Sequence, residues 1–119
     1  MASQKTRRNY SKQADTLFSK MVRARGVCEI KTDTDCLGSL QCCHGFSRRY
    51  RPTRWDFANC FAGCARHHQW WTAHPEEWTD WMKERLGSEG YERLRKRAMS
   101  GERIDPKVVL EGLRHLVVT

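Results

Sequence analysis

The residues of this chain best suited to chemistry are its cysteines and histidines, which gather between positions 28 and 74. The six cysteines lie at 28, 36, 42, 43, 60 and 64, and four of the five histidines lie at 44, 67, 68 and 74. Thiolate and imidazole are the ligands that zinc selects. No apolar segment typical of a secretory signal follows Met1, so we expect a cytoplasmic protein in a reducing compartment. In that setting the pattern favours metal ligation over the alternative, disulfides.

One pair in this set has the spacing of neighbouring zinc ligands. Cys64 and His67 are three residues apart on a predicted helix, so their side chains share one face of a helical turn. The next residue, His68, points about 100° away from His67. The helix is therefore predicted to border two sites, a structural ion beside His67 and a second site beside His68.

The elements that must position these residues alternate in type along the chain. Residues 1–10 are predicted to be a basic arm, followed by a helix from Ser11 to about Arg25. Short runs at 38–43 and 58–62 predict a small hairpin with an arginine-rich loop between its strands. Helices are expected at 64–72, from Pro75 to Gly87, from Ser88 to Ser100 and from Pro106 onward. This order predicts a small α+β fold, with one domain at 11–119, its core at 27–75 and C-terminal helices at 75–119.

Composition narrows the class of partner. The 119 residues include 22 Lys plus Arg and 14 Asp plus Glu, a net charge of +8, with an isoelectric point near 9.5. A polyanionic partner is expected, with nucleic acid first and an acidic membrane surface next. No segment approaches the ~20 apolar residues of a membrane span, so we expect no membrane insertion. The length excludes large multidomain enzymes.

The order of His44, Asn59 and His68 carries a resemblance to a known family. Around them the chain reads LQCCHGFSRRY at 40–50, TRWD at 53–56, HHQWWT at 67–72 and HPEEW at 74–78. This series resembles the HNH nuclease family, whose ββα-metal finger has this order and spacing. It looks like the bacteriophage HNH proteins grouped with the NinG-type recombination nucleases. The resemblance covers about residues 14–99.

The resemblance implies a metal-dependent endonuclease that hydrolyses DNA phosphodiester bonds, in a bacterial host cell if phage-encoded. It assigns His44 as general base and Asn59 as the amide that orients the base or supports the loop. It assigns His68 as a ligand of a catalytic divalent metal (Mg²⁺, Mn²⁺, Ni²⁺ or Zn²⁺). An imidazole suits the base role because its ordinary pKa of ~6.5 lets it accept a proton near neutral pH. The alternative is that His44 and His68 are both ligands of one structural zinc.

The residue before the base departs from the family's pattern. HNH enzymes often place Asp or His there to bind the catalytic metal, and this chain has Cys43. Either Cys43 ligates, which shifts the preference toward zinc, or His68, substrate phosphate and water hold the ion.

The structural zinc site departs as well. Family members often carry two Cys-x-x-Cys pairs, but here His67 replaces one cysteine and Lys31 lies three residues after Cys28. Cys36 is the expected substitute, which gives a zinc-stapled ββα-metal finger with a Cys₃His site formed by Cys28, Cys36, Cys64 and His67. The alternative is that Cys36 is only a small buried side chain.

Four arginines between the expected base and Asn59 are candidates for nucleic-acid binding: Arg48, Arg49, Arg51 and Arg54. Guanidinium groups grip phosphate bidentately, so we expect these residues to flank a catalytic groove and hold DNA. The alternative is that some of them pair with Glu76, Glu77 or Asp80. The competing function is a non-catalytic zinc module, derived from the HNH fold, that binds nucleic acid or a protein. Oligomeric state is left open.

Overall fold

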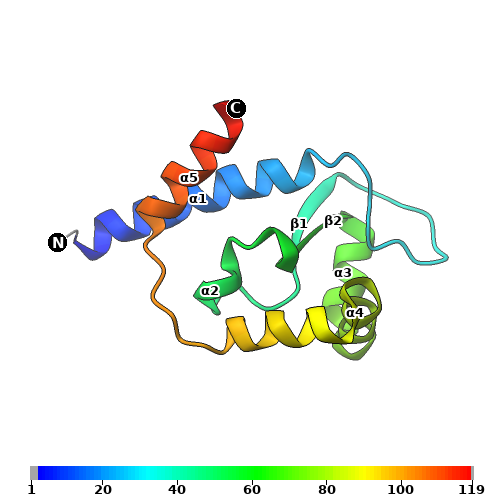
Figure 1. Cartoon of the computed structure of the whole chain (residues 1–119). Helices are drawn as coiled ribbons and strands as arrows, with labels where there is room; N and C mark the ends of the chain where they lie inside the picture. The colour runs from blue at the N-terminus through cyan, green and yellow to red at the C-terminus, as the bar shows by residue number, and fades with distance from the viewer. Residues whose placement is uncertain (1–2, 119) are drawn as a thin grey trace.

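The hairpin formed by two short strands is the middle layer of the molecule (Figure 1). The computed structural model describes residues 3–118. Its elements are α1 (Gln4–Arg23), β1 (Leu40–His44), α2 (Arg51–Arg54), the 3₁₀ helix η1 (Phe57–Asn59), β2 (Cys60–Cys64), α3 (Ala65–Ala73), α4 (Pro75–Ala98) and α5 (Pro106–Val118). The predicted α+β class is confirmed.

Each face of the hairpin is covered by its own core. On one face Cys60 and Ala62 pack with α1 and α5, through residues such as Phe18 and Leu110. On the other face Cys43 and Phe61 pack with Ile30 and with residues of α3 and α4, among them Trp71, Met82 and Leu94. Cys64, where β2 ends and α3 begins, belongs to this second core as well. In Figure 1, α1 and α5 lie together on one side of the hairpin, and α3 and α4 lie on the other. Successive strand residues point to opposite faces, so neighbours in the sequence serve different cores.

The strands pair antiparallel, from Leu40 opposite Cys64 to His44 opposite Cys60. The segment at 28–30 packs closely against β2, and this packing depends on Gly63. A Cβ at this position would lie 2.5 Å from Ile30 Cδ1 and 2.9 Å from Cys43 Sγ. Only glycine therefore leaves room for the 28–30 segment to lie against β2.

The first helix begins earlier than expected. It starts at Gln4, where the Ser3 hydroxyl accepts a hydrogen bond from Thr6 N–H, so the residues expected to form a basic arm at 1–10 are helical from position 4. Ser11, the expected cap, is buried inside the helix. Lysine and arginine are good helix formers, so the basic segment can be helical. Ser3 caps the helix in place of Ser11, and a serine in the interior does not have to end a helix.

The strands and their loop also differ from the prediction. Both strands begin two residues later than expected, at Leu40 and at Cys60, and they end at His44 and Cys64. The 3₁₀ helix η1 occupies 57–59 and so precedes β2. The loop contains the short helix α2, which begins next to Pro52. Gly87 breaks α4 as predicted, with φ 75° and ψ 159°, so α4 consists of two helical segments. The tryptophans at 71, 78 and 81 pack in or against the core of α3 and α4.

Candidate metal centre and histidine cavity

Four sulfur and nitrogen donors meet where the 28–36 segment crosses the start of α3. Cys28, Cys36, Cys64 and His67 place their ligand atoms within 4.8 Å of one another, a group that can hold a metal ion. Tetrahedral zinc with ligand bonds of about 2.0–2.3 Å separates its donors by roughly 3.5–3.8 Å, so small side-chain shifts suffice. This is the Cys₃His set that the sequence predicts, and its chemistry is compatible with structural zinc. We call it the zinc quartet.

The imidazole of the zinc quartet is already oriented. His67 Nδ1 lies 3.1 Å from Cys64 Sγ, 3.4 Å from Cys28 Sγ and 3.6 Å from Cys36 Sγ, so this nitrogen faces the thiols. The other nitrogen, Nε2, lies 3.0 Å from the carbonyl oxygen of Thr34 and donates to it. A metal-bound histidine commonly donates its second N–H to a carbonyl in this way, which fixes its tautomer.

The backbone supports thiolate at the same place. Cys64 is the N-cap of α3, and its sulfur accepts a hydrogen bond from His67 N–H. Burial opposes ionisation, but hydrogen bonds from the N–H groups of His67 and Leu37 and from the neighbouring thiols lower the pKa of Cys64 to about 6. Cys28 Sγ accepts from Cys64 N–H at 3.3 Å. Helix N-termini stabilise thiolates, the form that binds metal.

A separate cavity of about 540 Å³ lies between α1, β1 and α3. Its walls include Asp15 and Arg23 from α1, Gln41 and His44 from β1, and His68 from α3. The predicted base and the predicted metal ligand therefore open onto one space. We call it the histidine cavity.

His44 is held by the loop that follows it. Its Nε2 lies 2.9 Å from the carbonyl oxygen of Arg54, so Nε2–H donates and Nδ1 carries the lone pair. The Arg54 side chain is fixed in turn, with Nε 3.0 Å and Nη2 2.5 Å from the two oxygens of Asp15. Asp15 Oδ1 also accepts from Trp55 Nε1–H at 2.9 Å. One acid on α1 thus anchors the side chain of Arg54, whose carbonyl holds the imidazole, and the side chain of Trp55, the next residue.

His68 has a corresponding partner on β1. Its Nδ1 lies 2.6 Å from Gln41 Oε1, and because an amide oxygen only accepts, Nδ1–H donates and Nε2 carries the lone pair. Neither Gln41 nor Asp15 was singled out from the sequence. Each is 27 or more positions away in the sequence from the residue that it contacts, so no short spacing motif could have indicated the pair.

Both imidazoles favour the neutral form. Burial lowers the pKa of His44, and the charge of Arg48 lowers it further, against the opposing effect of the Arg54 carbonyl. Burial also lowers the pKa of His68. Neutral imidazole is the form that accepts a proton or binds a metal.

Asn59 supports the loop. The side chain is fully buried, its Nδ2 donates to the carbonyls of Phe46 and Thr53 at 3.0 Å each, and its Oδ1 accepts from Phe46 N–H at 2.7 Å. These bonds tie the end of β1 to α2. Of the two roles that the resemblance left open, the described contacts match loop support.

Cys43 points away from the histidine cavity. It is 2% exposed and packs with Phe61 and Ile30 in the core on the opposite face of the hairpin. In the structure, therefore, Cys43 lies in the core and not beside His44 in the histidine cavity. The reason is strand alternation, which sends adjacent residues to opposite faces.

The four arginines divide into two groups. Arg54 is bound to Asp15, and Arg51 donates to the Ser11 hydroxyl at 3.2 Å, so both side chains have partners within the protein. The partner of Arg54 is Asp15, not one of the acids on α4 that were expected. The side chain of Arg48 is 60% exposed at the cavity, although Asp15 lies 3.7 Å away, and Arg49 is exposed beside it.

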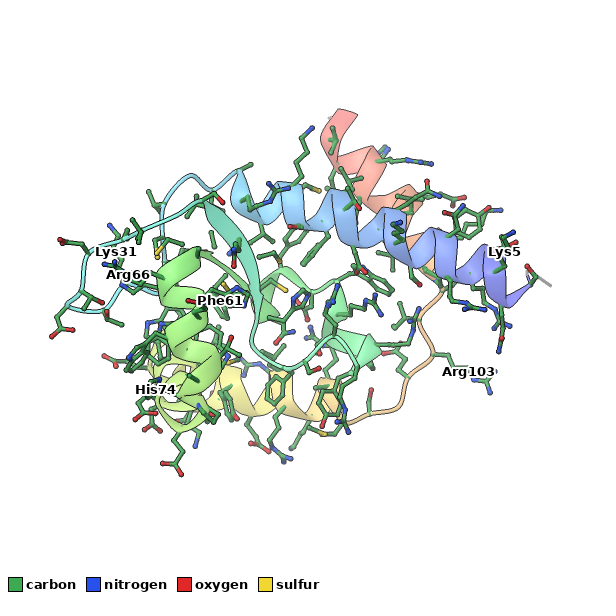
Figure 2. All side chains as sticks on the ribbon, turned by 180° about the vertical axis from the view of Figure 1, so that it is seen from behind. Lys5, Lys31, Phe61, Arg66, His74 and Arg103 are labelled. Carbon is green, nitrogen blue, oxygen red and sulfur yellow. The ribbon has the colours of Figure 1, made fainter. Side chains whose placement is uncertain are left out.

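Basic side chains lie at both ends of the molecule. Figure 2 shows Lys31 and Arg66 at the end that carries the zinc quartet, and Lys5 and Arg103 at the opposite end. The hairpin, marked by Phe61, lies between them.

Comparison with known proteins yields no relative. No family model, no curated protein and no solved structure matches the chain. Within residues 3–118, none of the helices has both the length and the apolar character that crossing a membrane requires.

Proposed function

We propose that this chain is a metal-dependent endonuclease of the HNH type that hydrolyses phosphodiester bonds in DNA. One observation carries the proposal: His44 and His68 line the same cavity, and each has one ring nitrogen fixed by an oxygen acceptor. Two imidazoles with defined tautomers beside one space suit a base and a metal ligand acting on one phosphate.

In this proposal His44 Nδ1 takes the proton of the attacking water. The resulting imidazolium keeps its Nε2–H bond to the Arg54 carbonyl, which favours the charged form. Asp15 acts as a positioning residue because it anchors the Arg54 and Trp55 side chains.

His68 Nε2 is the protein ligand of the catalytic ion, and Gln41 holds the ring in that orientation. When bound, a divalent metal supplies positive charge at the phosphate and the leaving oxygen. A site with few protein ligands fits Mg²⁺, which is commonly held with the help of substrate phosphate and water.

The choice of DNA rests on charge and exposure. The chain carries +8 overall, and Arg48 and Arg49 stand exposed at the loop that follows β1. Arg48 lines the histidine cavity, and in this proposal both arginines contact DNA phosphates without reading bases.

The test is nicking of supercoiled plasmid with Mg²⁺, Mn²⁺ or Ni²⁺. We expect His44→Ala to reduce the rate about 10²–10⁴-fold, with His68→Ala similarly impaired and the zinc of the zinc quartet retained in both. The matched control is His115→Ala, at an exposed histidine on α5. Equal cleavage by the wild type and both cavity variants would refute the assignment.

One observation favours the second candidate function, a non-catalytic zinc module. Cys43 faces the core, and the carboxylate in the histidine cavity, Asp15, is committed to Arg54. Absence of cleavage with every ion, on plasmid, branched and single-stranded DNA, with retained DNA binding, would make this the better account.

A further inference from the structure

A second group of metal-binding side chains lies on the face of the hairpin opposite Cys43. Cys42, His44 and Cys60 place one ligand atom each within 4.8 Å of one another. The group shares no residue with the zinc quartet. We call it the Cys₂His cluster.

The geometry of the strands explains why these three donors converge. His44 is directly opposite Cys60 in the antiparallel register, and Cys42 precedes His44 by two residues on the same face. Directly opposite residues have Cβ atoms about 4.5–5.5 Å apart. The donors are thus held by paired backbone rather than by a loop.

The three donors also differ in depth in a way that leaves one side open. Cys60 is fully buried, whereas Cys42 and His44 are half-buried and line the histidine cavity. A tetrahedral ion held by all three would therefore have its fourth position toward the cavity. Three protein ligands with an open fourth position is the arrangement of catalytic zinc sites, whereas structural sites are closed by four protein ligands. An ion held by three donors stays in contact with the cavity, so competing ligands can reach it.

The chemistry of the donors selects the ion. Two sulfurs and one imidazole nitrogen prefer zinc and other thiophilic ions over magnesium. Two thiolates would neutralise a divalent cation, which suits a site with little exposure to water.

We propose that Cys42, His44 and Cys60 form a second, exchangeable zinc site that competes with the catalytic role of His44. Because Nε2 is occupied by the Arg54 carbonyl, Nδ1 is the nitrogen left for the ion. That is the atom that must accept the proton of the attacking water, so zinc in the Cys₂His cluster switches off cleavage. Binding releases the two thiol protons to solvent. The inhibition rests on the proposed function, whereas the binding of zinc does not.

The first experiment counts zinc ions in the full-length protein after equilibration with excess Zn²⁺ and removal of loosely bound ion. We expect two per chain in the wild type and one in Cys42→Ser. The matched control is Cys43→Ser, an adjacent thiol on the other face of β1, which should retain two. One ion in the wild type, or two in Cys42→Ser, overturns the site.

A second measurement guards against misfolding of the variants. After replacement of zinc by Cd²⁺, cadmium NMR should show two thiolate-bound resonances in the wild type. Cys42→Ser should lose one and leave the resonance of the zinc quartet in place. Loss of both resonances together with loss of the circular dichroism signal would mark Cys42→Ser as unfolded. In that case His44→Ala, which removes another donor at a half-buried position, is the deciding variant. Two retained resonances in His44→Ala would overturn the site.

The consequence for cleavage is measured as the ratio of Mg²⁺-dependent nicking rates without and with Zn²⁺. We expect a reduction of about 100-fold in the wild type, as for loss of a general base, and in Cys43→Ser, but little change in the ratio for Cys42→Ser. A second bound zinc with no effect on nicking would overturn the competition at His44. Failure of the proposed function appears differently, as no nicking in either condition with the two zinc ions still present.

Discussion

Replacement of Asn59 by alanine is the sharpest test of how the loop after β1 is held. The fully buried amide makes three hydrogen bonds, to the carbonyls of Phe46 and Thr53 and from Phe46 N–H. A buried backbone group left without a partner costs about 1–3 kcal/mol. We therefore expect Asn59→Ala to lower the free energy of unfolding by roughly 4 kcal/mol after some relaxation. With a urea m-value of about 2 kcal/mol/M, the midpoint falls by about 2 M.

The assay is urea unfolding of zinc-saturated protein, followed by circular dichroism. The chain's other asparagine, Asn9, is exposed on α1 and supplies the control, because Asn9→Ala should change stability by less than about 0.5 kcal/mol. If Asn59→Ala loses less than about 1 kcal/mol but loses cleavage, the amide acts on His44 rather than on the loop, and the reasoning is refuted.

Three further predictions concern the metal and the charges. Chelation of zinc should abolish hydrogen-exchange protection around Cys64, since the zinc quartet joins the 28–36 segment to α3; unchanged protection would contradict a structural ion. Because the pKa of His44 lies below its ordinary 6.5, the acid limb of the pH–rate profile should lie below pH 6.5, and Arg48→Gln should move it upward by removing a charge that lowers that pKa; an unmoved limb would count against His44 as base. Arg48→Gln and Arg49→Gln should each reduce the slope of log affinity against log salt by about 1, and slopes equal to that of wild type would exclude phosphate contacts.

The features that the sequence predicts well depend on short spacing. The three-residue step from Cys64 to His67 forces both donors onto one helical face, and the structure places both in a group of side chains that can hold a metal ion. Gly87 is a second example, since its positive φ breaks α4 where the periodicity changes. In both cases the decisive interaction is local.

The features that the sequence did not predict depend on contacts between distant segments. Arg54 looked like a phosphate ligand because its partner, Asp15, lies 39 residues away on α1. The second strand begins later than predicted because Asp56 caps η1 by accepting from Ala58 N–H, and η1 precedes β2. The grouping of Cys42, His44 and Cys60 needs the strand register, and register follows from packing on both faces rather than from residue type.

The alternation along β1 has a consequence for insertions and deletions. Cys42 and His44 face one core and Cys43 faces the other, so a single-residue deletion just before Gln41 that shifted the strand by one position would exchange their surroundings. The imidazole would enter the tryptophan-rich interior, and the inert thiol would meet solvent beside Arg48. A register shift of one residue in this five-residue strand would thus abolish the proposed chemistry, although the cysteines and the histidine would all remain in the chain.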